Sequence, residues 1–164
     1  MRHPFFVDAR ENGFTLTELV MVIAIVAVIA VFAAPRFSRT VYDTRTVYDE
    51  LFAQVAYARK AAIAQRRAVC VHLGAAQSVL RYDDNTPGTC NAASTGVASP
   101  GGTAPFTINA GTTVFAPAVV FRFDALGRYL TAGGADPGAA LVVTVTGDGA
   151  PQFTVERGTG YVHP

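Results

Sequence analysis

A single carboxylate, that of Glu18, lies near the beginning of a long apolar stretch. Between Phe14 and Ala34 the sequence has no other charged residue. A stretch of this length is able to cross a hydrocarbon core of ~30 Å. An ionised carboxylate in such surroundings is costly unless it is paired, so Glu18 is a candidate functional residue that needs a cationic partner.

The residue before Phe14 indicates what that partner is. If a peptidase cuts between Gly13 and Phe14, the new α-amino group of Phe14 lies about one helical turn from Glu18. The amino group and the carboxylate can then neutralise each other, within one chain or between neighbouring chains. If such a cut occurs, the chemistry is proteolytic processing followed by ion pairing.

Together, the short polar leader, Gly13, Phe14, Glu18 and the apolar run resemble the processing site of type IV prepilins and type II secretion pseudopilins. The resemblance implies that a membrane-bound prepilin peptidase cleaves after Gly13 and N-methylates Phe14. It also implies that Glu18 recruits the positive N-terminus of an adjacent subunit during assembly. Pro35 matches a proline common in these proteins and is expected to kink the helix.

The same resemblance implies a location and partners. The precursor is expected in the bacterial inner membrane as a single-pass protein with a periplasmic C-terminal domain, and later in a pilus or pseudopilus. Its expected partners are the membrane, other pilin or pseudopilin subunits, the prepilin peptidase and the inner-membrane assembly platform. Nucleic acid is not expected, although a DNA-binding minor pilin or a tip adhesin is the alternative function.

Two simpler interpretations compete with this one. The stretch is also compatible with a signal anchor whose glutamate is incidental, or with a secretory signal peptide cut after Ala33. Three features argue against the signal peptide: the apolar run is longer than usual, Glu18 interrupts its start, and Pro35 follows the cut closely.

The elements that position this motif follow from periodicity. After Pro35 one apolar stripe recurs at helical spacing and predicts an amphipathic helix over 35–68 that packs on a sheet. Short strand patterns separated by turn signals then predict antiparallel pairing. The stripe residues are Val47, Leu51, Val55, Ala58 and Ala62. The predicted strands are 68–73, 78–82, 106–109, 113–115, 119–123, 128–131, 141–146, 152–156 and 161–163.

The predicted fold class is α+β. A long N-terminal helix, transmembrane in its first half and amphipathic in its second, packs on a C-terminal antiparallel β-sheet or sandwich. The expected segments are a leader (1–13), a transmembrane and assembly helix (14–34), an amphipathic helix (35–68) and a β-rich globular domain (69–164). The 164-residue length allows one modest domain beyond the membrane helix.

Two later segments resemble particular subgroups of these proteins. The helix followed by many short strands, with 121–128 among them, looks like the GspH/FimT-like minor pseudopilins and minor pilins. The ending 159–163 looks like the minor pilins of mannose-sensitive haemagglutinin-type pili.

The two cysteines, Cys70 and Cys90, have two interpretations. In an oxidising compartment they form a disulfide, which we favour because Cys90 falls in a polar loop predicted over 83–104. The alternative is two unpaired, partly buried thiols.

Other candidate chemistry is weaker. The run 83–86 offers oxygen atoms to calcium but lacks the spacing of an EF-hand, which favours a solvated turn. The late-helix cations Arg59, Lys60, Arg66 and Arg67 suit phosphate contacts or, as we favour, a solvated face. We therefore expect no enzyme activity, cofactor or metal site. A net charge of +1 also provides no overall attraction to nucleic acid.

Overall fold

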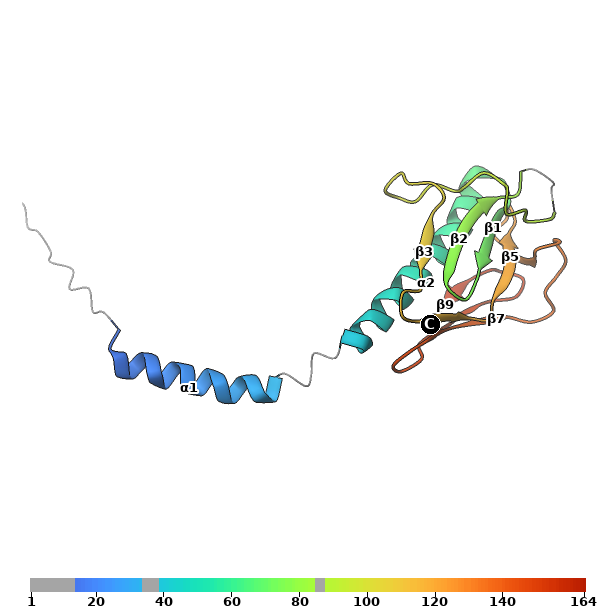
Figure 1. Ribbon diagram of the computed structural model, residues 1–164. Helices are drawn as coiled ribbons and strands as arrows, with labels where there is room; N and C mark the ends of the chain where they lie inside the picture. The colour runs from blue at the N-terminus through green and yellow to red at the C-terminus, as the bar shows by residue number, and fades with distance from the viewer. Residues whose placement is uncertain (1–13, 34–38, 85–87) are drawn as a thin grey trace, which may run out of the picture. The chain divides into compact units, whose positions relative to one another are not determined.

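The computed structural model describes residues 14–33, 39–84 and 88–164; the side chains of 31–33 and 39–42 are outside this description. The chain divides into two compact units, Met1–Ser38 and Arg39–Pro164, each of which is defined by the contacts within it. In the described part, the first unit contains helix α1, and the second contains helix α2 and strands β1 to β9 (Figure 1).

Helix α1 covers Leu16–Ala33. Thr15 caps it, because its Oγ1 accepts a hydrogen bond from the backbone N–H of Glu18 at 3.2 Å. Thr15 and Glu18 have the spacing of a capping box, and the bond satisfies one of the N–H groups that have no intrahelical partner. The local sequence therefore determines where α1 begins.

Helix α2 covers Arg39–Gln65. Its predicted stripe is confirmed: Leu51, Val55, Ala58 and Ala62 are fully buried, and Val47 packs against them.

A Schellman motif ends α2 before the predicted limit at residue 68. The backbone N–H groups of Arg66 and Arg67 donate to the carbonyl oxygens of Ile63 and Ala62, at 3.3 and 3.2 Å. Arg66 adopts a φ of 51° there, a position where glycine is usual.

The strands form two antiparallel sheets in the described chain. One has five strands in the order β3-β2-β1-β5-β6, and the other has four in the order β4-β7-β8-β9. Val71 in β1 pairs with Leu80 on one side and with Phe121 on the other. The strands of the first sheet are β1 Val69–Leu73, β2 Gln77–Tyr82, β3 Thr107–Asn109, β5 Val119–Phe123 and β6 Tyr129–Thr131. Those of the second are β4 Val114–Ala116, β7 Leu141–Thr146, β8 Gln152–Val155 and β9 Val162–His163.

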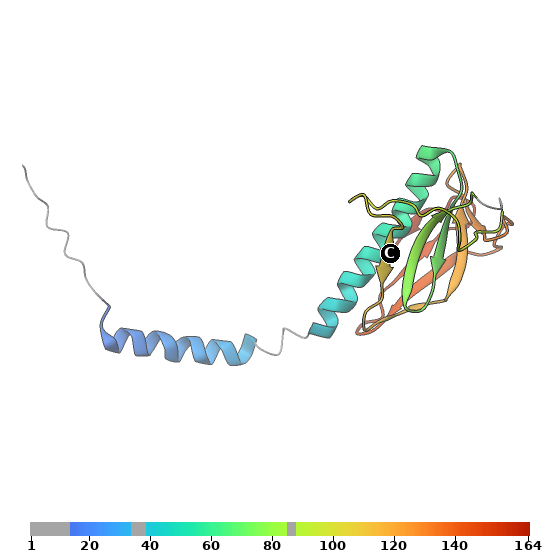
Figure 2. The same ribbon diagram turned by 45° about the horizontal axis from the view of Figure 1, so that its top comes forward.

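One apolar core joins α2 to both sheets. The helix contacts β1, β3 and β5 of the first sheet and β7 and β9 of the second, and Figures 1 and 2 show it lying alongside the sheets. Four phenylalanines, Phe115, Phe121, Phe123 and Phe153, are each at most 1% exposed. A helix packed on antiparallel sheet confirms the predicted α+β class.

The segment predicted as a long exposed loop over 83–104 is partly buried instead. Ser94 and Val97 are 2% and 1% exposed. The backbone N–H of Val97 donates to the carbonyl oxygen of Leu80 at 3.1 Å, so the segment runs beside β2. The predicted loop is confirmed for the described residues, since no helix or strand lies between β2 and β3, but its exposure is confirmed only in part. Gly, Pro and Ser indicate irregular backbone but do not reveal whether that backbone packs on a sheet.

Candidate functional site

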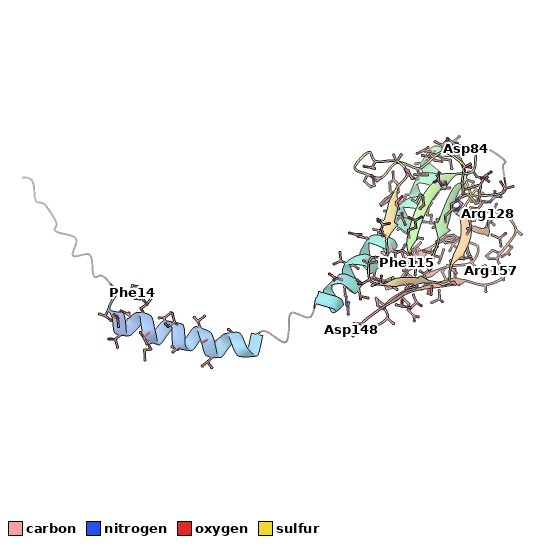
Figure 3. The ribbon with its side chains drawn as sticks, in the orientation of Figure 1. Phe14, Asp84, Phe115, Arg128, Asp148 and Arg157 are labelled. Atoms are coloured by element: carbon pink, nitrogen blue, oxygen red, sulfur yellow. A yellow bond between two sulfur atoms is a disulfide. The ribbon has the colours of Figure 1, made fainter. Side chains whose placement is uncertain are left out.

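The processing and assembly motif lies at the beginning of α1. The predicted cleavage residue Gly13 lies outside the described residues. The Phe14 side chain is 76% exposed, and Figure 3 labels it where α1 begins. Glu18 is exposed in the first helical turn, so its carboxylate is accessible to a cation.

Glu18 combines two properties. A carboxylate in the first turn favours helix formation, because it complements the positive end of the helix dipole. An ionised carboxylate also accepts hydrogen bonds only, so its natural partner is an ammonium or guanidinium group. Together these properties make the beginning of α1 a candidate site for a cationic partner.

The rest of α1 presents apolar side chains to its surroundings. Leu16, Met21 and Ile29 are 80%, 67% and 60% exposed, and the other large apolar side chains described in this helix are exposed as well. Contiguous exposed apolar surface marks an interaction site in a folded protein. Taking only the described residues, none of the helices combines the length and the apolar character needed to cross a membrane. The predicted kink residue Pro35 lies outside the described residues.

Cys70 and Cys90 are joined in a disulfide. Cys70 in β1 is fully buried and Cys90 is 5% exposed. The bond ties the segment after β2 to the face of the first sheet that points away from α2. Both cysteines belong to the globular unit Arg39–Pro164.

The described residues of the run 83–86, Asp83 and Asp84, bind other groups of the globular unit through their carboxylates. The Asp83 carboxylate pairs with the guanidinium of Arg122 and accepts the backbone N–H of Gly88. The Asp84 carboxylate accepts the backbone N–H of Thr95 at 3.2 Å. Hydrogen bonding from the Thr95 side chain, and then from this N–H, lowers the pKa of Asp84. Among the described residues no group of three or more His, Cys, Asp or Glu side chains is placed to hold a metal ion.

Sequence reasoning missed the role of Arg122. Its neighbours Phe121 and Phe123 face the core, so strand alternation alone places Arg122 on the opposite face. There its ion pair with the nearly buried Asp83 anchors the segment that also contains Cys90. Strand alternation could therefore have predicted which face of the sheet Arg122 lies on. It could not have predicted that Asp83 is its ion-pair partner.

The four late-helix cations do not act as one cluster. Arg59 Nε donates to the backbone oxygens of Gly127 and Thr159, both at 3.2 Å. The Arg67 guanidinium lies 4.1 Å from the centre of the Tyr82 ring. Lys60 and Arg66 are exposed.

Two titratable contacts lie near the C-terminus. The Arg157 guanidinium donates to both carboxylate oxygens of Asp136 and lowers the pKa of Asp136 to about 2. Glu156 Oε1 lies 2.9 Å from His163 Nε2, and this hydrogen bond raises the pKa of His163. Both contacts tie loops or strand ends together on the surface.

Comparison with known proteins gives a match at the N-terminus. Residues 8–34 match the family described as the prokaryotic N-terminal methylation motif, which confirms the predicted type IV pilin-like N-terminus. No curated protein matches the chain. Among solved structures, it is similar to the crystal structure of the type IV minor pilin FimU of Pseudomonas aeruginosa strain PAO1. The TM-score is 0.49 and the sequence identity 18%, over 73% of this chain and 90% of that chain.

Proposed function

We propose that this chain is a structural assembly subunit, a minor pilin or pseudopilin of a type IV pilus or a type II secretion pseudopilus. The observation that carries the proposal is the methylation motif over residues 8–34, which includes Gly13, Phe14 and Glu18. The exposed apolar side chains of α1 add support, because they provide a surface suited to burial in lipid or against other helices.

The proposed mechanism has two stages. Segment 14–34 first holds the precursor in the inner membrane, with the globular unit on the periplasmic side. A prepilin peptidase removes residues 1–13, exposes the Phe14 amino group and methylates it, and the inner-membrane assembly platform then takes up the processed subunit. Glu18 then pairs with the N-terminus of an adjacent subunit, and the apolar side chains of α1 pass from lipid into the filament core.

The globular unit fits this location. A disulfide between Cys70 and Cys90 persists in oxidising compartments such as the bacterial periplasm. The apolar core is closed within 39–164, since the described buried apolar residues all lie in that unit. The unit is therefore able to remain folded while α1 changes its surroundings.

Mass spectrometry of the mature N-terminus tests the proposal. We expect a chain that begins with N-methylated Phe14. A chain that begins with Ala34 would instead indicate a secreted protein, and assembled filaments whose subunits retain residues 1–13 would contradict the proposal. As a matched pair, Gly13→Ala should still be cleaved, whereas Gly13→Val should accumulate as precursor because the peptidase must approach the backbone closely.

DNA binding or adhesion at a filament tip is the alternative. A salt-dependent shift of DNA by the protein would favour it. The structure adds little to this alternative, because Arg59 and Arg67 direct their guanidinium groups to carbonyl oxygens and to an aromatic ring. Lys60, Arg66 and Arg67 are the exposed cations of that group, and the Arg67 guanidinium also lies 3.9 Å from the Asp84 carboxylate.

A further inference from the structure

The disulfide between Cys70 and Cys90 fastens an irregular segment to the first sheet. No helix or strand lies between β2 and β3 in the described chain. The backbone is bonded to the sheet again at Thr95, whose carbonyl oxygen accepts the N–H of Tyr82 at 2.8 Å. We call residues 88–94 the tethered segment.

Polar contacts hold the two ends of the tethered segment. The N–H of Gly88 donates to the Asp83 carboxylate at 2.7 Å, and the carbonyl oxygen of Ser94 accepts a hydrogen bond from Arg81 at 2.8 Å. Before Ser94, Cys90 is the segment's only buried residue, and none of the described residues of the apolar core belongs to the segment. Without the disulfide, the segment therefore loses its main attachment to the sheet and leaves the apolar core intact.

Two features favour opening of the tethered segment once the bond is absent. Cys90 has a φ of 48°, a left-handed conformation that costs free energy in a residue other than glycine. Ser94 Oγ, Asp83 Oδ1 and Arg122 Nε are buried without a hydrogen-bond partner among the described residues, and contact with water would satisfy them. We therefore expect the segment of the reduced protein to open while the sheet stays folded.

Cys70 lacks this freedom. Strand β1 is paired on both sides, and Cys70 lies opposite Arg81 of β2 and Arg122 of β5. Residues directly opposite each other in antiparallel strands project from the same face, so a long side chain flanks the Cys70 sulfur on each side. The rate of thiol–disulfide exchange depends on access to the sulfur. Once the segment opens, a bulky oxidant therefore reaches Cys90 more readily than Cys70.

We propose that this disulfide forms in a fixed order, in which Cys90 reacts first with a disulfide-carrying oxidant and Cys70 completes the bond. In the first step the Cys90 thiolate attacks the oxidant's disulfide, forms a mixed disulfide and displaces one oxidant thiolate. In the second step the Cys70 thiolate attacks Cys90 Sγ and displaces the other oxidant thiolate. The two protons of the cysteine thiols pass to the displaced thiolates, so one protein dithiol is oxidised and one oxidant disulfide is reduced. The order concerns the globular unit alone and does not depend on the proposed subunit role.

Two single-cysteine variants of the full-length protein in detergent test the order. With oxidised glutathione as the oxidant, Cys70→Ser keeps Cys90 and should form the mixed disulfide about tenfold faster than Cys90→Ser, which keeps Cys70. Mass spectrometry of acid-quenched samples measures both rates. Equal rates in the folded variants, or a faster reaction of Cys70, would overturn the proposal.

Denaturant provides the control for the same two variants. The two rates should become similar there, because neither thiol is shielded in the unfolded chain. A difference that persisted in denaturant would also overturn the proposal, since the fold would not be its cause.

Reduced wild-type protein provides a test without a substitution. Oxidised glutathione added to it should give a transient species with glutathione on Cys90, followed by the Cys70–Cys90 bond and release of the glutathione. Peptide mapping after acid quenching locates the modified residue. Glutathione found mainly on Cys70 would reverse the order and contradict the proposal.

Hydrogen exchange tests the opening step separately. On reduction, the amides of Gly88 and Ser94, which are hydrogen-bonded in the oxidised protein, should exchange faster. The amides of Val71 and Leu80, in the paired strands β1 and β2, should keep their protection. Unchanged protection at Gly88 and Ser94, or loss of protection at Val71, would remove the difference in access between the two cysteines and with it the proposed order.

Discussion

The two helices of this protein use apolar residues in opposite ways. In α1 the large apolar side chains that the structure describes are exposed, from 47% for Val22 to 80% for Leu16. In α2 the apolar stripe is buried, and Leu51 and Val55 are fully covered. One helix therefore stabilises the folded unit, whereas the other is available for contacts outside it.

The difference arises from the distribution of residues around each helix. Apolar residues surround α1 on all sides, and a single sheet face is unable to cover such a helix. In α2 the apolar residues form one stripe with polar residues on the opposite side, which is the pattern of a helix that packs on a core. We therefore expect changes in α1 to affect assembly and changes under α2 to affect folding.

The largest expected effect is that of Glu18→Ala, which should affect assembly without affecting folding. Under the proposed mechanism, Glu18→Ala should leave the protein in the membrane but impair its incorporation into filaments, because the N-terminus of the neighbouring subunit would lose its anionic partner. The unfolding midpoint of the globular unit should not change. Immunoblots of sheared filaments and membranes measure incorporation, with Thr17→Ala as the neighbouring control. Normal incorporation of Glu18→Ala would contradict the expectation that changes in α1 affect assembly.

Phe153→Ala should have the opposite effect from Glu18→Ala: it should destabilise the globular unit and leave the assembly motif of α1 unchanged. The Phe153 ring contacts the rings of Tyr48 and Phe52 on α2, at 6.0 and 5.7 Å between centres. Its loss leaves a cavity between helix and sheet and should cost about 3–5 kcal/mol in the free energy of unfolding. Denaturant unfolding of the full chain in detergent measures this cost.

Val26→Ala in α1 is the matched control for that measurement. Val26 is 57% exposed, so its truncation should not shift the unfolding midpoint. Equal losses for the two variants would mean that α1 belongs to the same core after all.

Loss of the disulfide should have a smaller effect on the same unit. The bond links residues with a sequence separation of 20. Breaking a disulfide that closes a loop of this length should lower the free energy of unfolding by about 3 kcal/mol. Unfolding of the Cys70→Ser and Cys90→Ser double variant, compared with the wild type with and without reductant, measures it. A reductant-insensitive midpoint in the wild type would contradict the bond's contribution.

The smallest expected effect is a pH dependence at the C-terminal strand. Glu156 raises the pKa of His163 in the folded protein above its usual 6.5. This contact therefore stabilises the fold fully below pH 6.5 and loses its contribution as pH rises through the higher folded pKa. NMR titration of the His163 ring measures the pKa, and Glu156→Gln should lower it. An unchanged pKa in that variant would show that the carboxylate has no influence.

Local patterns determined a large part of this protein. The spacing of Gly13, Phe14 and Glu18 predicted the methylation motif without any structure. The stripe from Val47 to Ala62 predicted which face of α2 is buried, and short alternating runs predicted the strands. These features are readable because helix periodicity, strand alternation and capping depend on residues close together in sequence.

Tertiary structure decided how those elements combine. No local pattern divides the strands into two sheets, pairs Asp83 with Arg122, or lays the segment around Val97 beside β2. The physical reason is that strand partners and loop positions follow from long-range packing, in which many short apolar strands are locally equivalent candidates for the same neighbour.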